Sequence, residues 1–169
     1  MRTVFHYTLS ATLPAIVESE ALRPSNAGAP DEVPLLWFSA HQTWEPTASK
    51  KMGTLAGQYE LTFQEQLEMF GCVRFGLSKL DYRLMPWHVA CKAGGIGEMT
   101  RRKLERVGIK RGGIPAHWFA VEGYMPLAGL SFEVFGDAAW HAAEPAEMAQ
   151  VWIEKRGEEA AASTLFRLS

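Results

Sequence analysis

Residues 3–8, Thr-Val-Phe-His-Tyr-Thr, form the stretch that decides the fold. Their β-branched and aromatic side chains are typical of a β-strand. Because side chains alternate between the two faces of a strand, we expect Val4, His6 and Thr8 on one face and the two aromatic residues on the other. The chain therefore opens on a predicted strand that places a histidine among apolar neighbours.

Strand and helix patterns continue along the chain. Thr12 and the helical spacing of the apolar residues after it predict a helix directly behind the first strand. Short apolar runs predict further strands at 35–39, 72–77, 117–122 and 130–135. Further helices are expected at 63–70, at 98–107 and from residue 145 onward.

Local signals support two of these helices and one loop. Thr62 and Glu65 have the spacing of a capping box at the start of a helix. Gly108 is expected to close the charged helix before it, because glycine favours helix ends. The segment 41–59 contains proline and glycine and is predicted to be loop-rich.

Together these elements predict one domain of the α+β class that spans residues 1–169, with a C-terminal helical tail at about 145–169. The sheet is expected to be split and mostly antiparallel, with helices on its flanks. A chain of 169 residues is long enough to bury a core, and its 47% hydrophobic and 21% charged residues match a globular protein.

Composition also narrows the location and the partners. The net charge of −2 gives the chain as a whole no electrostatic reason to bind nucleic acid or a membrane surface. Its apolar runs are far shorter than the roughly 20 residues of a membrane span. Cys72 and Cys91 are too few for a disulfide framework, and their spacing with His88 matches no known metal site. We therefore predict a cytoplasmic protein without a bound metal.

One segment departs from the overall charge. Between Lys92 and Arg111 seven basic residues stand against two acidic ones, a local charge of +5. Such a patch is typical of a surface that binds phosphate groups, although a solvated helix face has the same pattern. The candidate partner-binding residues in it are Arg101, Arg102, Lys103 and Arg106.

Three short motifs occur in an order that points to a known fold. They are His6-Tyr7-Thr8 in the first strand, Trp37-Phe38-Ser39 in the second and Phe132-Glu133-Val134 in a late one. This order resembles the ADP-ribosyltransferase fold, especially the branch of the DarT-type DNA-targeting toxins and the tRNA 2′-phosphotransferases. The resemblance covers mainly residues 3–40 and, more loosely, 117–135.

The resemblance implies an enzyme that uses NAD as its substrate and needs no metal. Glu133 would stabilise the ribose cation that forms when nicotinamide leaves, with His6 and Ser39 as the other catalytic residues. The residues implied in nucleotide binding are His6, Tyr7, Thr8, Trp37 and Arg74. ADP-ribose would pass to a nucleic-acid or protein target. This hypothesis requires His6 and Glu133 to lie close together on the same face.

Some features favour other interpretations. The family's toxins carry an arginine after the second strand, and residues 40–45 contain none. That gap favours a non-catalytic binding or inhibitor protein, encoded by a phage or mobile element, that acts through its aromatic and basic surfaces. Glu45 could serve as an alternative catalytic carboxylate, but we interpret it as the cap of a helix that begins near Pro46.

Overall fold

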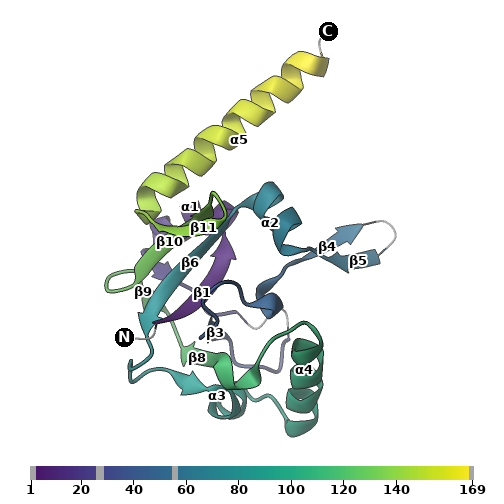
Figure 1. The fold of residues 1–169 in the computed structure, drawn as a ribbon, viewed down its shortest axis with the longest axis vertical. Coiled ribbons are helices and arrows are strands. Elements are labelled where there is room, and N and C mark those ends of the chain that lie inside the picture. The colour runs from purple at the N-terminus through teal and green to yellow at the C-terminus, as the bar shows by residue number, and fades with distance from the viewer. Residues whose placement is uncertain (1–2, 26–28, 55–56, 168–169) are drawn as a thin grey trace.

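The structure, a computed structural model, describes residues 3–25, 29–54 and 57–167. Its centre is an antiparallel sheet of seven strands in the order β11-β10-β6-β1-β3-β8-β7 (Figure 1). The bounds of these strands are β1 Thr3–Leu9, β3 Leu35–Ser39, β6 Cys72–Ser78, β7 Met85–Pro86, β8 Trp118–Glu122, β10 Ser131–Gly136 and β11 Ala139–Ala142. The predicted α+β class with a mostly antiparallel sheet is confirmed.

Two further strand pairs lie outside this sheet. β2 (Ala21–Leu22) pairs with β9 (Met125–Pro126), and β4 (Lys51–Thr54) pairs with β5 (Gly57–Glu60). The second pair projects from the body of the molecule as a ribbon (Figure 1). The prediction that 41–59 is loop-rich is therefore wrong in part. Its glycines, which suggested a loop, lie in the two strands of this hairpin.

The helices lie on both sides of the sheet. They are α1 Leu13–Ser19, α2 Phe63–Phe70, α3 Trp87–Ala93, α4 Glu98–Lys110 and α5 Pro145–Arg167, with 3-10 turns at η1 Ser10–Thr12, η2 Pro46–Ala48 and η3 Pro115–His117. The capping box of α2 is confirmed, because the Thr62 hydroxyl accepts from the Glu65 amide while the Glu65 carboxylate accepts from the Thr62 amide.

Gly108 does not close α4 as predicted. The helix runs on through it to Lys110. The glycine has a packing role, because a Cβ atom built on Gly108 would lie 2.4 Å from Cη2 of Trp118. The indole of Trp118 therefore lies directly against the backbone of α4, and it can do so only where no side chain intervenes.

The main core lies on one face of the sheet. Val4, Val73, Phe75 and Leu77 are almost fully buried there, and α1 and α5 cover them. The predicted alternation along β1 is confirmed, because Val4, His6 and Thr8 pair with Leu77, Phe75 and Val73 of this face, and Arg74 of β6 points to the opposite face. That opposite face carries a smaller apolar cluster at β3 and β8, against α3.

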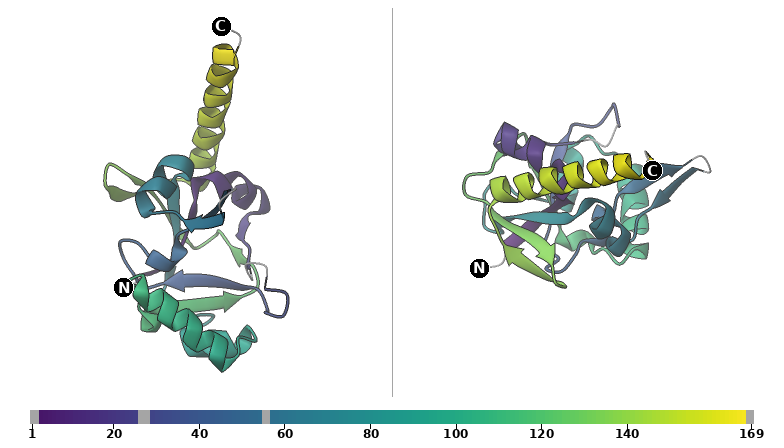
Figure 2. Two further views of the ribbon diagram at one scale, coloured as in Figure 1. Left: turned by 90° about the vertical axis from the view of Figure 1, so that its right-hand side faces the viewer. Right: turned by 90° about the horizontal axis from the view of Figure 1, so that it is seen from above.

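β1 and β3 are neighbours in the sheet but share little backbone pairing. β1 matches β6 at seven Cα pairs along its whole length, but it matches β3 at a single described pair, Phe5 with Ser39. Figure 2 shows β3 and β8 with α3 and α4 at one end of the molecule, while α5 extends from the other end. Within the described ranges no helix has the length and apolar character of a membrane span.

Candidate functional site

A cavity of about 520 Å³ opens where β1 and β3 part. Its walls come from β1, from β3, from the 45–50 segment and from α4. Side chains from both faces of β3 contribute, among them Trp37 and Phe38. The volume lies within the range of small-molecule sites. The parting of the two strands therefore creates a space that could hold a ligand.

His6 lies at the gap between the strands. Its Nδ1 atom is 2.8 Å from the carbonyl oxygen of Trp37, across the position where a backbone ladder would otherwise continue. A carbonyl only accepts, so Nδ1 carries the proton and Nε2 is left as an acceptor. Burial, together with the positive charge of Lys50, lowers the pKa of His6 to about 4. At neutral pH the ring is therefore uncharged, and its Nε2 has no hydrogen-bond partner among the described residues.

Ser39 and Glu45 form a buried polar pair that also lines the cavity, and because Ser39 pairs with Phe5 in the β1–β3 register, its side chain points to the face opposite that of His6. The Ser39 hydroxyl donates to Oε2 of Glu45 at 2.6 Å. The other oxygen, Oε1, accepts from the amide and the hydroxyl of Thr47 at 3.2 and 2.7 Å. Glu45 is 5% exposed, and its side chain caps η2 as predicted. Glu45 also lines the cavity, so the residue that caps η2 is the same residue that could act as the alternative catalytic carboxylate.

Three tryptophans form the apolar part of the site. The Trp37 and Trp87 rings lie 5.4 Å apart, and Trp87 and Trp118 lie 5.0 Å apart with their rings nearly perpendicular. The Trp87 indole is held by a 2.6 Å hydrogen bond to Glu105 of α4. This arrangement gives the cavity flat aromatic surfaces that suit a planar ring.

Cations line the remaining wall. Arg23, Lys50 and Arg111 all contribute to the cavity, with Glu32 and Glu45 as the acidic members. Desolvation of the Lys50 amine lowers its pKa, although much of the rest of its side chain remains exposed. Arg111 is already paired with Glu60 at 2.6 Å, so Arg23 and Lys50 are the cations that favour an anionic ligand such as a phosphate ester.

Comparison of the chain with protein-family models, curated proteins and solved structures gave no match. The chemistry of the site must therefore be inferred from its own geometry.

That geometry separates Glu133 from His6. His6 is level with Phe75 in the β1–β6 register, and Glu133 is level with Arg74 in the β10–β6 register. Since neighbouring residues of β6 point to opposite faces, His6 and Glu133 lie on opposite faces of the sheet. The expected proximity of these two residues is not found.

Arg74 and Glu133 instead form a pair of their own. Arg74 donates through both Nε and Nη2 to Oε2 of Glu133. Its guanidinium also lies 3.8 Å from the ring centre of Phe5 and 4.4 Å from that of Trp140. Neither Arg74 nor Glu133 lines the cavity, so the structure leaves both of these expected site residues outside it.

Of the other expected site residues, some line the cavity and one lies outside it. His6, Tyr7, Trp37 and Ser39 line the cavity, whereas Thr8 does not. The Thr8 hydroxyl is buried and lies 3.2 Å from that of Thr12. Among the described residues no group of three His, Cys, Asp or Glu side chains could hold a metal ion. Metal-independence stays a prediction.

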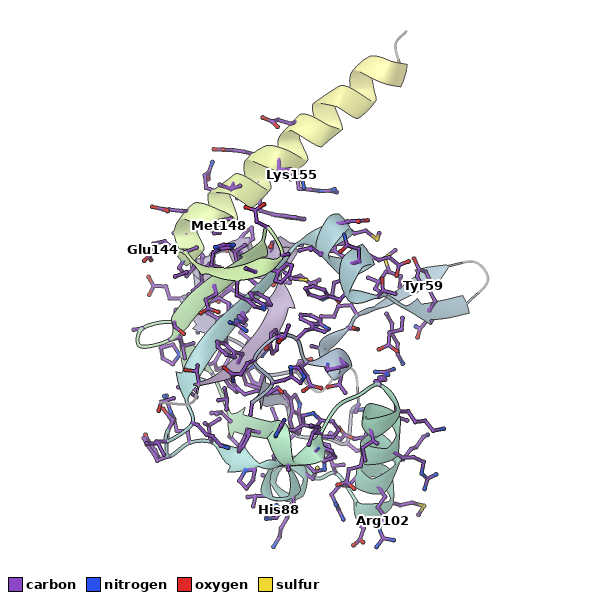
Figure 3. The ribbon with its side chains drawn as sticks, viewed as in Figure 1. Tyr59, His88, Arg102, Glu144, Met148 and Lys155 are labelled. Carbon is purple, nitrogen blue, oxygen red and sulfur yellow. The ribbon has the colours of Figure 1, made fainter. Side chains whose placement is uncertain are left out.

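The basic residues of α4 lie on different sides of the helix. Arg101 pairs with Glu105 at 2.6 Å, and Arg102 pairs with Glu98. Figure 3 shows Arg102 at the outer end of α4, away from the sheet. Lys103, Arg106 and Lys110 have the i, i+3, i+7 spacing of a single stripe, and none of the described residues forms an ion pair with them. Leu104 and Val107, which line the cavity, share the helix with this stripe.

Sequence reasoning missed several residues of the cavity. Trp87 and Lys50 carried no motif and reach the site through α3 and the 45–50 segment, while Arg111 was counted only as part of the basic 92–111 segment. Glu45 did carry a signal, because it lies six residues after Ser39 in a Trp-Glu-Pro stretch. That signal predicted a cap and left the contact with Ser39 unforeseen.

Proposed function

We propose that this protein binds NAD in the cavity between β1 and β3 and transfers its ADP-ribose group, with Glu45 as the catalytic carboxylate. The observation that carries the proposal is the neutral His6, whose Nδ1 is fixed on the Trp37 carbonyl. Its Nε2 is left as an acceptor for a ribose hydroxyl. The motifs of β1 and β3 that carry the resemblance meet at the cavity and support the choice of NAD, whereas the Glu133 motif lies outside it, so the form of the hypothesis that requires Glu133 beside His6 is given up.

The lining of the cavity suits the parts of this ligand. The tilted rings of Trp37 and Trp87 offer apolar surfaces to the planar nicotinamide or adenine ring. Arg23 and Lys50 suit the pyrophosphate, while Arg111 is already paired with Glu60. Glu45 lines the same cavity, so in this proposal the sugar lies against its carboxylate.

The reaction needs one carboxylate and no metal. The bond between C1′ of the ribose and the nicotinamide nitrogen breaks, and its electron pair leaves with neutral nicotinamide. Glu45 stabilises the positive charge that develops on the ribose, while Ser39 and Thr47 hold its carboxylate in place. A nucleophilic atom of the acceptor then bonds to C1′ and loses its proton.

The acceptor would meet α4 first. Leu104 and Val107 of this helix line the cavity, and the basic stripe of Lys103, Arg106 and Lys110 runs along the same helix. An anionic acceptor, a nucleic acid or an acidic protein segment, is therefore favoured over a basic one.

One observation favours a second function. Arg74 and Glu133 are joined in an ion pair, so the arginine and the glutamate expected from the resemblance are both engaged in the framework. In this second reading the protein is a binding or inhibitor protein, and the cavity holds a nucleotide without cleaving it.

Calorimetric titration of the purified protein with NAD tests the proposal, together with a chromatographic assay for released nicotinamide. We expect micromolar to millimolar binding that His6→Ala abolishes while the circular dichroism spectrum is retained. His88→Ala is the matched control, because His88 is exposed on α3 and does not line the cavity (Figure 3). Binding without nicotinamide release would favour the second function, and absence of binding to the folded protein would refute both.

A further inference from the structure

Three consecutive carbonyl groups in the loop after β3 accept hydrogen bonds from three different strands. Tyr7 of β1 donates its hydroxyl to the His41 carbonyl at 2.5 Å. Arg74 of β6 donates Nη1 to the Gln42 carbonyl at 2.5 Å, and Trp140 of β11 donates Nε1 to the Thr43 carbonyl at 2.7 Å. The backbone of this loop is thereby tied to the far half of the sheet.

Each of the three donors is itself held in place. Glu133 and the ring of Phe5 fix the guanidinium of Arg74. Burial raises the pKa of Tyr7 to about 12, so its hydroxyl keeps the proton that it donates. The Trp140 ring lies 4.4 Å from the Arg74 guanidinium and 5.8 Å from the Tyr7 ring. The three donors therefore form one connected group, which we call the loop clamp.

The residue after the clamped carbonyls is also fixed by packing. The Trp44 ring lies 5.1 Å from the Tyr7 ring and 4.6 Å from the Phe63 ring of α2. Glu45 follows directly, with its carboxylate bonded to Ser39. Residues 41–44 are thus anchored one after another up to the proposed catalytic carboxylate.

We infer that Tyr7, Arg74 and Trp140 are positioning residues that fix the Glu45 carboxylate in the cavity wall. This inference rests on the proposed function, and it gives Glu133 a role that its distance from the cavity otherwise leaves open. Glu133 orients Arg74, Arg74 holds the Gln42 carbonyl, and the loop then presents Glu45. Displacement of a reacting group by about 1 Å can cost a hundredfold in rate.

Trp140→Phe gives the sharpest test, because it removes the N–H donor, keeps an aromatic ring and changes no residue of the cavity. Tyr7→Phe removes a single hydroxyl, and the double variant combines the two losses. Tyr82→Phe is the control, since this tyrosine is 93% exposed in a loop far from the clamp. All variants are measured for nicotinamide release at varied NAD concentrations and for hydrogen exchange of the 42–45 amides.

We expect Trp140→Phe to lower kcat by about tenfold while KM stays within about twofold, because the loss concerns the carboxylate and spares the NAD-binding groups. Amide exchange at 42–45 rises in parallel, and it does not rise in Tyr82→Phe. Unchanged kcat and unchanged exchange in the double variant overturn the inference.

The two proposals fail in different ways. If the unmodified protein releases no nicotinamide, the proposed function fails, and hydrogen exchange alone then decides whether the clamp fixes the loop. If the protein is active and the exchange rises without any change in kcat, the clamp holds the loop but does not position the carboxylate, and the inference is overturned.

Discussion

Glu133 lies directly opposite Arg74 in the β10–β6 register, and the two side chains pair on the face of the sheet that His6 does not share. The only carboxylate that lines the cavity and is bonded to Ser39 among the described residues is that of Glu45. This relationship moves the proposed catalytic role from Glu133 to Glu45, and it makes the two glutamates experimentally separable.

Glu45→Gln should lower the rate of nicotinamide release by at least about a hundredfold, because the amide cannot stabilise the charge on the ribose. The amide oxygen can still accept from Thr47, so the variant should fold and bind NAD. Single-turnover kinetics and calorimetry check the two halves of the prediction. Loss of activity that comes only from loss of NAD binding would contradict it.

Glu133→Gln should act mainly on stability, and on the rate only through the loop clamp. It leaves the Arg74 guanidinium, which is 8% exposed, without its anionic partner, so the free energy of unfolding should fall by about 2 kcal/mol. NAD affinity should remain within about threefold of that of the unmodified protein, since Glu133 lies outside the cavity. Urea unfolding measures the first effect. A variant of full stability that cannot bind NAD would return Glu133 to the site.

Protonation of His6 should make the fold sensitive to acid. Its pKa is about 4 in the folded protein and near 6.5 in an unfolded chain, so between these values only the unfolded state takes up the proton. The free energy of unfolding should therefore be constant above about pH 6.5 and fall as the pH drops toward 4, by about 3 kcal/mol. Urea titrations across this range test it. A folded His6→Phe variant that shows the same slope would assign the effect to other groups.

Two helical glycines should respond oppositely to alanine. Gly108→Ala places a methyl group 2.4 Å from Trp118, so we expect a loss of about 1–3 kcal/mol despite the better helix propensity of alanine. Gly157→Ala in α5 meets no atom within 4 Å and should be neutral or stabilising by up to about 1 kcal/mol. Thermal unfolding of both variants compares them. Equal melting temperatures would show that the indole yields to the methyl group at no cost.

The basic stripe of α4 should dominate the binding of anions. Replacing Lys103, Arg106 and Lys110 with glutamine should weaken binding to a single-stranded oligonucleotide by about tenfold or more at low salt, and it should flatten the salt dependence. Arg102→Gln is the control, because Arg102 is already paired with Glu98. Fluorescence anisotropy at several salt concentrations provides the measurement. Equal losses in the triple variant and the control would show that the whole helix acts only through its net charge.

Five of the seven strands of the main sheet and most helices could be predicted because their signals are local, whereas the short strands β7 and β11 were not predicted. β1, β3 and β6 carry β-branched or aromatic runs, and α2 carries its capping box within four residues. α3 was not predicted from the sequence, because it begins at Trp87, directly after the two-residue strand β7. The role of Gly108 was misjudged because it depends on Trp118, which is remote from the local helix signal.

Apart from Glu45, the sequence pointed only to those site residues that lie on the predicted strands β1 and β3. His6, Trp37 and Ser39, which the sequence singled out as site residues, line the cavity because β1 and β3 form its walls, and their roles stay predictions. The fate of Glu133 depended on the register of β10 against β6, and its partner lies 59 residues away. No local pattern reports which distant side chain a strand will face.

The parting of β1 and β3 has a mechanical consequence. Backbone pairing between the two parts of the sheet is limited to the Phe5–Ser39 match, supplemented by the His6 imidazole and by the side chains that grip the 41–43 loop. A ligand in the cavity would touch β1 on one side and β3 and β8 on the other, so it would act as a removable cross-link across a junction that has little backbone pairing. Ligand binding would therefore reduce the motion of the whole β3-β8-β7 half of the sheet, including atoms that the ligand does not contact.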